Sequence, residues 1–121
     1  MFNIFKRKKR IKASLINKEI FDERIMQNKE TALVTFSAAW CGACKMQKPL
    51  INDLADHHKE SSVLIAFVDV DDQRELSQQF GIKSMPTTIA FQNGEPVFKK
   101  SGLLTRRNLE DIIRELQKTS E

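Results

Sequence analysis

Two short apolar runs dominate the hydrophobic pattern of the chain. Residues 31–37 read TALVTFS and residues 62–70 read SVLIAFVDV. Both runs are rich in β-branched and aromatic residues and contain few polar positions, which is typical of strands that are covered on both faces. A segment with helical signals follows each run. The pattern therefore predicts parallel strands connected by helices.

Four segments carry helical periodicity or helix boundary signals. A helix over about residues 17–28 begins with Asn17, a good N-cap, and Thr105 is a good N-cap for the last helix. A second helix is predicted over about residues 41–58, and a short third one, opened by acids and closed by a glycine, over residues 71–81. The apolar stripes of the first and last helices are Ile20, Phe21, Ile25 and Met26, and Leu109, Ile112, Ile113 and Leu116.

A hairpin is predicted near the end of the chain. The runs at residues 87–92 and 96–101 flank Asn93-Gly94, the strongest short-range signal for a tight hairpin turn. The element order is then β-α-β-α-β-α-β-β-α. This order predicts an α/β domain whose central mixed sheet combines parallel crossovers with a C-terminal antiparallel hairpin, flanked by about four helices.

The composition is that of one globular domain. The chain has 121 residues, of which 40% are hydrophobic and 30% charged, and single domains commonly contain about 100 to 200 residues. No apolar run approaches the roughly 20 residues that a membrane-spanning helix requires. The sequence therefore excludes an integral membrane protein built from helices.

The basic residues are concentrated at the N-terminus. Residues 1–12 contain six lysines and arginines and no acid, whereas the remainder has 14 basic and 16 acidic side chains. We predict a disordered basic tail over residues 1–13 and a domain over residues 14–121. The tail, with its few apolar residues, would have weak affinity for an anionic membrane surface. Phosphates would attract the same charges, but nothing in the sequence indicates specific binding of nucleic acid.

Cys41 and Cys44 are the only cysteines. Basic and polar residues such as Lys12 and Lys18 interrupt the apolar run that a secretory signal would need after its basic start, so we expect a cytoplasmic protein. In a reducing compartment a close cysteine pair is more often catalytic, redox-sensing or metal-binding than structural. The short loop between the two cysteines also limits how far a disulfide could constrain the unfolded chain.

The pair stands at a predicted strand-to-helix turn. Open α/β sheets place their sites beyond the carboxyl ends of the strands, and unpaired N–H groups at a helix N-terminus favour a thiolate. We therefore expect Cys41 to be a nucleophile and Cys44, one turn further along, to resolve a mixed disulfide on Cys41. A structural disulfide and a metal site remain as alternatives, although His57 and His58 lie at the far end of the same helix and are most simply a solvated helix end.

The chain resembles the thioredoxin family over residues 14–118. The resemblance rests on the element order and on four separated features. These are WCGACK at residues 40–45, Pro49 inside the following helix, Met85-Pro86-Thr87 before a strand, and Asn93-Gly94 with Gly102 after it.

The resemblance implies a role for each matching residue. Pro86 matches the family's cis proline, which lies against the cysteine pair and exposes the preceding backbone to a bound chain. Pro49 matches a proline that kinks the active-site helix. The residues that match the substrate-binding rim are Trp40, Gly42, Ala43, Met85, Pro86 and Gly102.

Four residues depart from the family pattern. Thr35 and Phe67 stand where a buried aspartate and its lysine neighbour are usual, so both charges are absent together. Threonine, unlike the aspartate it replaces, is no base near neutral pH. We therefore expect Cys44 to lose its proton more slowly and to resolve the mixed disulfide more slowly. Ala43 replaces a proline and Ser37 a tryptophan; the alanine restores an N–H near the nucleophile and should make the disulfide more oxidising.

The resemblance implies a thiol-disulfide oxidoreductase that reduces disulfides of other proteins and is recharged by a thioredoxin reductase. The two sulfurs carry the electrons, so neither a cofactor nor a metal is expected, and nothing in the sequence demands more than a monomer. Two alternatives stay open at this point. One is a disulfide isomerase or mild oxidase on the same fold; the other is a binding module in which redox turnover is incidental.

Overall fold

The computed structural model describes residues 9–119. Its elements, in chain order, are β1 (Ser14–Leu15), α1 (Lys18–Phe21), the π-helix η1 (Asp22–Gln27), β2 (Ala32–Ser37), α2 (Gly42–His57), β3 (Leu64–Asp69), α3 (Arg74–Gln79), β4 (Thr87–Gln92), β5 (Glu95–Ser101) and α4 (Arg106–Thr119). The predicted element order is confirmed, with boundaries that differ by a few residues at most helix and strand ends.

Within residues 9–119, five strands form one mixed sheet in the order β1-β3-β2-β4-β5. β3 runs parallel to β1 and to β2, whereas β4 runs antiparallel to β2 and to β5. The turn between β4 and β5 has positive φ at both Asn93 (54°) and Gly94 (79°), which is the geometry that makes Asn-Gly favourable in a tight hairpin. The mixed α/β fold expected from the sequence is therefore confirmed.

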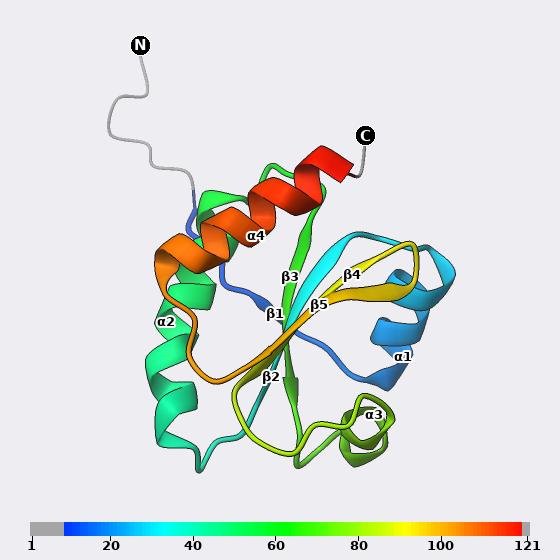
Figure 1. Ribbon diagram of the computed structural model, residues 1–121, viewed down its shortest axis with the longest axis vertical. Helices are drawn as coiled ribbons and strands as arrows, with labels where there is room; N and C mark the ends of the chain where they lie inside the picture. The colour runs from blue at the N-terminus through cyan, green and yellow to red at the C-terminus, as the bar shows by residue number, and fades with distance from the viewer. Residues whose placement is uncertain (1–8, 120–121) are drawn as a thin grey trace.

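Helices cover both faces of the sheet (Figure 1), with α2 and α4 on one face and α1 and α3 on the other. Successive side chains of β2 alternate between the two layers, because side chains of a strand point to opposite faces in turn. Val34 and Phe36 pack in the core on the α1 and α3 side, and Leu33 packs in the core on the α2 and α4 side. This double covering explains the nearly unbroken apolar runs of β2 and β3.

The first predicted helix is not a regular α-helix throughout. Asn17 caps it as expected, its side chain accepting a hydrogen bond from the Ile20 N–H. After one turn the backbone widens into η1, and the Asn28 N–H bonds to the Glu23 carbonyl five residues earlier. Because the wider turn changes the angular spacing of side chains, Ile25 stays fully buried while Met26, expected on the same stripe, is 37% exposed.

Part of the predicted basic tail lies within the described residues and contacts α2. Arg10 pairs with Asp53 at 2.8 Å, the Ile11 N–H donates to Asp56, and the Ala13 N–H donates to Asn52. Residues 1–8 lie outside the described part of the chain. The predicted disorder of these residues, and the predicted contact of residues 1–12 with an anionic membrane, therefore stay predictions. Among residues 9–119, no helix has both the length and the apolar character needed to cross a bilayer.

Candidate active site

The two cysteines lie at the turn that connects the carboxyl end of β2 to α2. Cys41 is the N-cap of α2, and its sulfur accepts a hydrogen bond from the Cys44 N–H at 3.2 Å. The Cys41 thiol also donates to the Met85 carbonyl, with a sulfur to oxygen distance of 3.4 Å. Both thiols are free, and both side chains are largely buried, Cys41 at 8% and Cys44 at 4% exposure. An N–H group directed at a sulfur stabilises its negatively charged form, so the cap geometry suits Cys41 for nucleophilic attack.

The surroundings of Cys44 favour its protonated form. Burial raises the pKa of the Cys44 thiol, and the neighbouring Cys41 raises it further. Hydrogen bonding by the Ser37 side chain and by the Ala38 backbone acts in the opposite direction, but the net pKa shift is upward. Cys44 therefore has to lose a proton before it can attack a disulfide, because only the thiolate is nucleophilic.

The loop before β4 lies directly against the cysteine pair. The Met85-Pro86 peptide bond is cis, as the resemblance implied. Met85 packs against the small cluster formed by Ala38, Cys41 and Cys44, and Pro86 is buried. The Gly102 N–H donates to the Pro86 carbonyl at 2.8 Å, which brings Gly102 to the same place.

Trp40 stands beside the pair with 67% of its surface exposed. Its indole Nε1 donates a hydrogen bond of 2.9 Å to Asp71, in the turn that follows β3. Gly42 is exposed, and a Cβ added there would meet no atom within 4 Å. The fold thus gathers all of the sequence-predicted site residues around Cys41. The contribution of Asp71 was missed, and its position 31 residues further along the chain offered no signal for it.

A groove of about 490 Å³ lies behind Cys44, on the α2 side of the sheet. Ser37 and Asp69, which are register partners at the ends of β2 and β3, line it together with Cys44. Phe67, which stands at the position of the family's lysine, also lines the groove. Lysines 12, 45 and 48 form part of its wall. The groove therefore places polar groups next to the sulfur that has to lose its proton.

Thr35 makes no charged contact below the cysteines. Its Oγ1 lies 3.0 Å from Oγ1 of Thr88 across the β2-β4 pair, and its side chain is only 1% exposed. The two hydroxyls satisfy each other, and no buried side-chain polar atom in the described residues lacks a partner. Loss of both family charges has therefore left no orphaned group, but the expected slow resolution stays a prediction.

Comparisons with known proteins agree on one family. A family model described as thioredoxin matches residues 12–115. The chain is 39% identical over 88 residues to a thioredoxin of Alicyclobacillus acidocaldarius subsp. acidocaldarius, which covers 73% of the chain and 83% of that protein. It is 36% identical over 98 residues to a probable thioredoxin-2 of Caenorhabditis elegans, which covers 81% of the chain and 67% of that protein. Among solved structures, the thioredoxin Mala s 13 of Malassezia sympodialis superposes with a TM-score of 0.79 at 28% identity, covering 91% of this chain and 95% of that one.

Proposed function

Because the chain belongs to the thioredoxin family and is a thiol-disulfide oxidoreductase of the disulfide reductase type, we propose the following roles for its residues. Cys41 is the nucleophile and Cys44 the resolving cysteine. The observation that carries this assignment is the asymmetry of the pair. Cys41 accepts the Cys44 N–H at the start of α2, whereas burial raises the pKa of Cys44.

The reaction then runs in two displacements. The Cys41 thiolate attacks one sulfur of a substrate disulfide, forming a mixed disulfide and expelling the other substrate sulfur as a thiolate. Cys44 loses its proton and attacks the Cys41 sulfur, which releases the second substrate thiol and leaves a Cys41–Cys44 disulfide. The substrate gains two electrons and the pair loses two. A reductase must return these electrons before the next cycle.

The proton of Cys44 is proposed to leave through the groove behind it. Thr35 has no ionisable group, and its hydroxyl is paired with Thr88. The hydrogen bond of the Ser37 side chain, in contrast, lowers the pKa of Cys44. Ser37 and Asp69 both line the groove. Ser37 therefore stabilises the attacking Cys44 thiolate, and the groove offers the released proton a path toward Asp69.

Protein disulfides are the proposed substrates, bound on the surface formed by Trp40, Gly42, Ala43, Met85, Pro86 and Gly102. An extended chain would lie along the backbone before Pro86, where the Met85 carbonyl already faces the Cys41 sulfur. A thioredoxin reductase is the proposed electron donor. A cytoplasmic location is proposed because both cysteines belong to the pair, so the chain has no separate structural disulfide.

Turnover of a model protein disulfide with a small dithiol as electron donor tests the assignment. Cys41→Ser should lower turnover to the uncatalysed rate of the dithiol. Cys44→Ser, mixed with the protein disulfide in the absence of the dithiol, should still attack and accumulate a mixed disulfide that non-reducing gel electrophoresis detects. Turnover that Cys41→Ser leaves unchanged would exclude Cys41 as the nucleophile. Accumulation of the mixed disulfide in Cys41→Ser instead of Cys44→Ser would reverse the two roles.

A further inference from the structure

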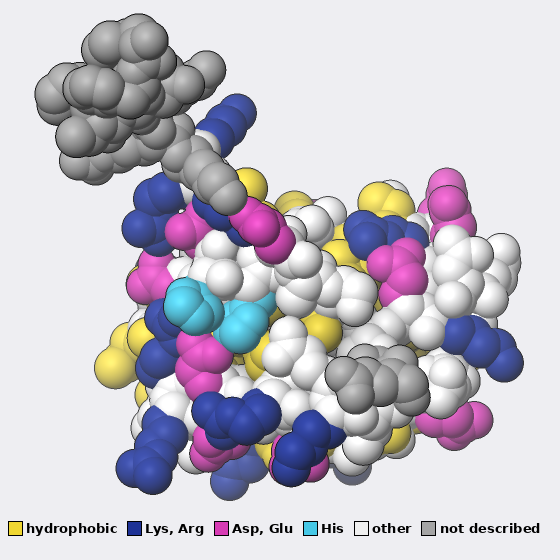
Figure 2. All heavy atoms as spheres, turned by 90° about the horizontal axis from the view of Figure 1, so that it is seen from above, with side chains coloured by type: hydrophobic (Ala, Val, Ile, Leu, Met, Phe, Trp, Pro, Cys, Tyr) yellow, Lys and Arg dark blue, Asp and Glu magenta, His cyan; other side chains and the backbone are white. Residues whose placement is uncertain are grey.

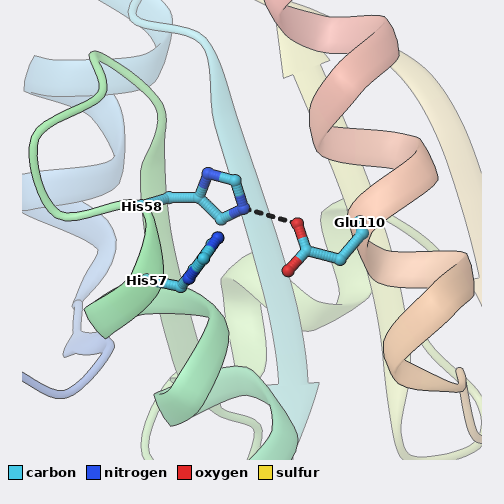
Figure 3. A group of neighbouring side chains, drawn as sticks. All are labelled: His57, His58 and Glu110. Atoms are coloured by element: carbon cyan, nitrogen blue, oxygen red, sulfur yellow. Dashed lines mark hydrogen bonds and ion pairs between the residues drawn. The ribbon is translucent and has the colours of Figure 1, made fainter.

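Two histidines and a glutamate meet at the end of α2 that is remote from the cysteines. Figure 3 shows His57 and His58 at the end of this helix, with the His58 ring directed toward Glu110 of α4 and the His57 ring beside it. One potential ligand atom from each of the three side chains lies within 4.8 Å of the other two. His58 Nε2 is 2.6 Å from Glu110 Oε1, and the two imidazole rings are 4.8 Å apart and nearly perpendicular.

Local backbone geometry makes this meeting possible. Consecutive residues of a regular α-helix point about 100° apart, which would separate the two rings. His58 is instead the C-cap of α2, with φ −104° and ψ 21°, outside the helical region. The helix therefore ends between the two histidines, so that His58 contacts the carboxylate while a ring nitrogen of His57 lies within 4.8 Å of it.

The carboxylate is also held in place from its other side. Arg106, one turn earlier in α4, contacts Oε2 of Glu110 at 3.0 Å, which leaves Oε1 facing His58. Carboxylates that ligate metals are commonly oriented by such a second hydrogen bond. The guanidinium also offsets the negative charge of Glu110, so we expect the three side chains to bind a cation with modest affinity.

From this geometry we propose that His57, His58 and Glu110 form a binding site for Zn²⁺. Two imidazole nitrogens and one carboxylate oxygen are a donor set that zinc accepts, with water completing the coordination. Zinc holds its donor atoms about 2.0 to 2.2 Å from the ion, and therefore about 3.4 Å from one another in a tetrahedron. Rotation of the exposed His57 ring brings its nitrogen closer, whereas the hydrogen-bonded atoms of His58 and Glu110, now 2.6 Å apart, have to separate slightly as zinc takes the place of the proton between them.

The proposed site is accessible and separate from the redox centre. Figure 2 shows the two imidazoles side by side at the surface, next to an acidic side chain. His57 follows Cys44 by 13 residues within α2 (57 − 44), a separation of about 20 Å along the helix at a rise of about 1.5 Å per residue. Zinc bound here would connect α2 to α4 and would stabilise the folded state by mass action. This inference does not depend on the proposed roles of Cys41 and Cys44.

The test is a zinc titration of the full chain, without a histidine tag and with the Cys41–Cys44 disulfide formed so that the thiols cannot bind metal. Calorimetry should show one saturable site, and ¹H–¹⁵N spectra of the imidazole rings should show shifts at both histidines. His57→Ala should weaken binding at least tenfold. Glu110→Gln should weaken it as well, whereas Glu115→Gln, an exposed carboxylate on the same helix, should leave it unchanged.

Thermal unfolding supplies a second readout. Added zinc should raise the melting temperature of the oxidised wild type and of Glu115→Gln, but not that of His57→Ala. Because His57 is exposed, its replacement should leave the fold intact, which circular dichroism checks. The proposal is overturned if no saturable binding occurs below 1 mM zinc, or if His57→Ala binds zinc as tightly as the wild type.

Discussion

The side chain of Gln47 is hydrogen-bonded twice to the backbone of Leu104. Its Nε2 donates to the Leu104 carbonyl at 3.0 Å, and its Oε1 accepts the Leu104 N–H at 2.7 Å. Gln47 lies in α2 one turn after Cys44 and is only 1% exposed. The pair of bonds ties the active-site helix to the segment between β5 and α4, which contains Gly102 of the substrate surface.

Replacing Gln47 by leucine should therefore destabilise the protein by about 2 to 6 kcal/mol. A leucine of similar size would fill the space but leave a buried N–H and a buried carbonyl of Leu104 without partners, at about 1 to 3 kcal/mol each. Urea unfolding measures the change. The matched control is Gln78→Leu in α3, where the side chain is exposed and the change should stay within about 0.5 kcal/mol. Equal effects at the two positions would contradict the role given to the Gln47 bonds.

Ser37→Ala should slow release of the substrate from the mixed disulfide. The serine side chain lowers the pKa of Cys44, which burial raises, so its removal should move that pKa further up and reduce the thiolate fraction near neutral pH. Since one hydrogen bond to a charged group contributes about 1.5 to 3 kcal/mol, we expect a decrease of about tenfold or more. Single-turnover stopped-flow kinetics measures the step, with attack by Cys41 as the internal control. Ser37→Thr, which keeps the hydroxyl, should release the substrate at the rate of the wild type. A role for Ser37 would be excluded if Ser37→Ala were as fast as the wild type, or if Ser37→Thr were as slow as Ser37→Ala.

Trp40→Ala should raise KM for a protein disulfide by about 5- to 30-fold, with a small effect on reaction with a small-molecule disulfide. Exposed aromatic residues at binding surfaces commonly contribute about 1 to 2 kcal/mol, and the bond to Asp71 holds this indole in position before a substrate arrives. The matched control is Val97→Ala, an exposed apolar residue (54%) on β5. A similar loss with both disulfides would assign Trp40 to the chemistry of the pair instead of to substrate binding.

Ala43→Pro should make the pair more reducing. Ala43 is the second residue of α2, where no intrahelical hydrogen bond uses the N–H, so proline fits the backbone. Proline removes the N–H of residue 43, a donor near Cys41 that favours the thiolate of the reduced form. Because the reduced form is then less stable relative to the disulfide, the potential should fall. A loss of about 1.4 kcal/mol corresponds to about 30 mV for a two-electron couple. Equilibration with glutathione measures the potential, and Ala43→Ser, which retains the N–H, should match the wild type. A potential of the proline variant at or above that of the wild type would refute the expectation.

The ion pair between Arg24 and Glu30 should make a pH-dependent contribution to stability. Two contacts of 2.7 and 2.8 Å join the side chains, and the hydrogen bond from Arg24 is the main cause that lowers the pKa of Glu30. A carboxyl whose pKa is lower in the folded state stabilises the protein above its unfolded pKa of about 4.3, and this contribution is lost as the pH falls through the lower folded value.

Glu30→Gln should therefore reduce stability at pH 7 and have a smaller effect at pH 3. The pair is partly exposed, so the difference at pH 7 should be at most about 1 kcal/mol. Urea unfolding at both pH values measures it, and Glu75→Gln, an exposed glutamate in α3, is the control. An effect of Glu30→Gln that does not change between the two pH values would contradict the ion-pair explanation.

Local patterns in the chain were sufficient to predict most of the fold. The alternation and length of the apolar runs predicted β2, β3 and the β4-β5 hairpin, and the caps at Asn17 and Thr105 were read directly from residue type. Prediction worked for these elements because their signals lie within a few neighbouring residues. It correctly predicted a helix through the region after Phe21 but not the π-helical hydrogen bonding there, and it was wrong about the burial of Met26.

The candidate site also has a part that local sequence predicts and a part that only the fold shows. The spacing of Cys41 and Cys44 after a strand determined the redox chemistry, since a strand-to-helix turn by itself places one sulfur at a helix N-terminus. Only the tertiary structure decided what surrounds the pair. The groove behind Cys44, the bond from Trp40 to Asp71, the two bonds from Gln47 to Leu104, and the meeting of His57 and His58 with Glu110 all join residues that are far apart in the chain. Such contacts depend on how the helices lie on the sheet, which is a property of the packed molecule and not of any short segment.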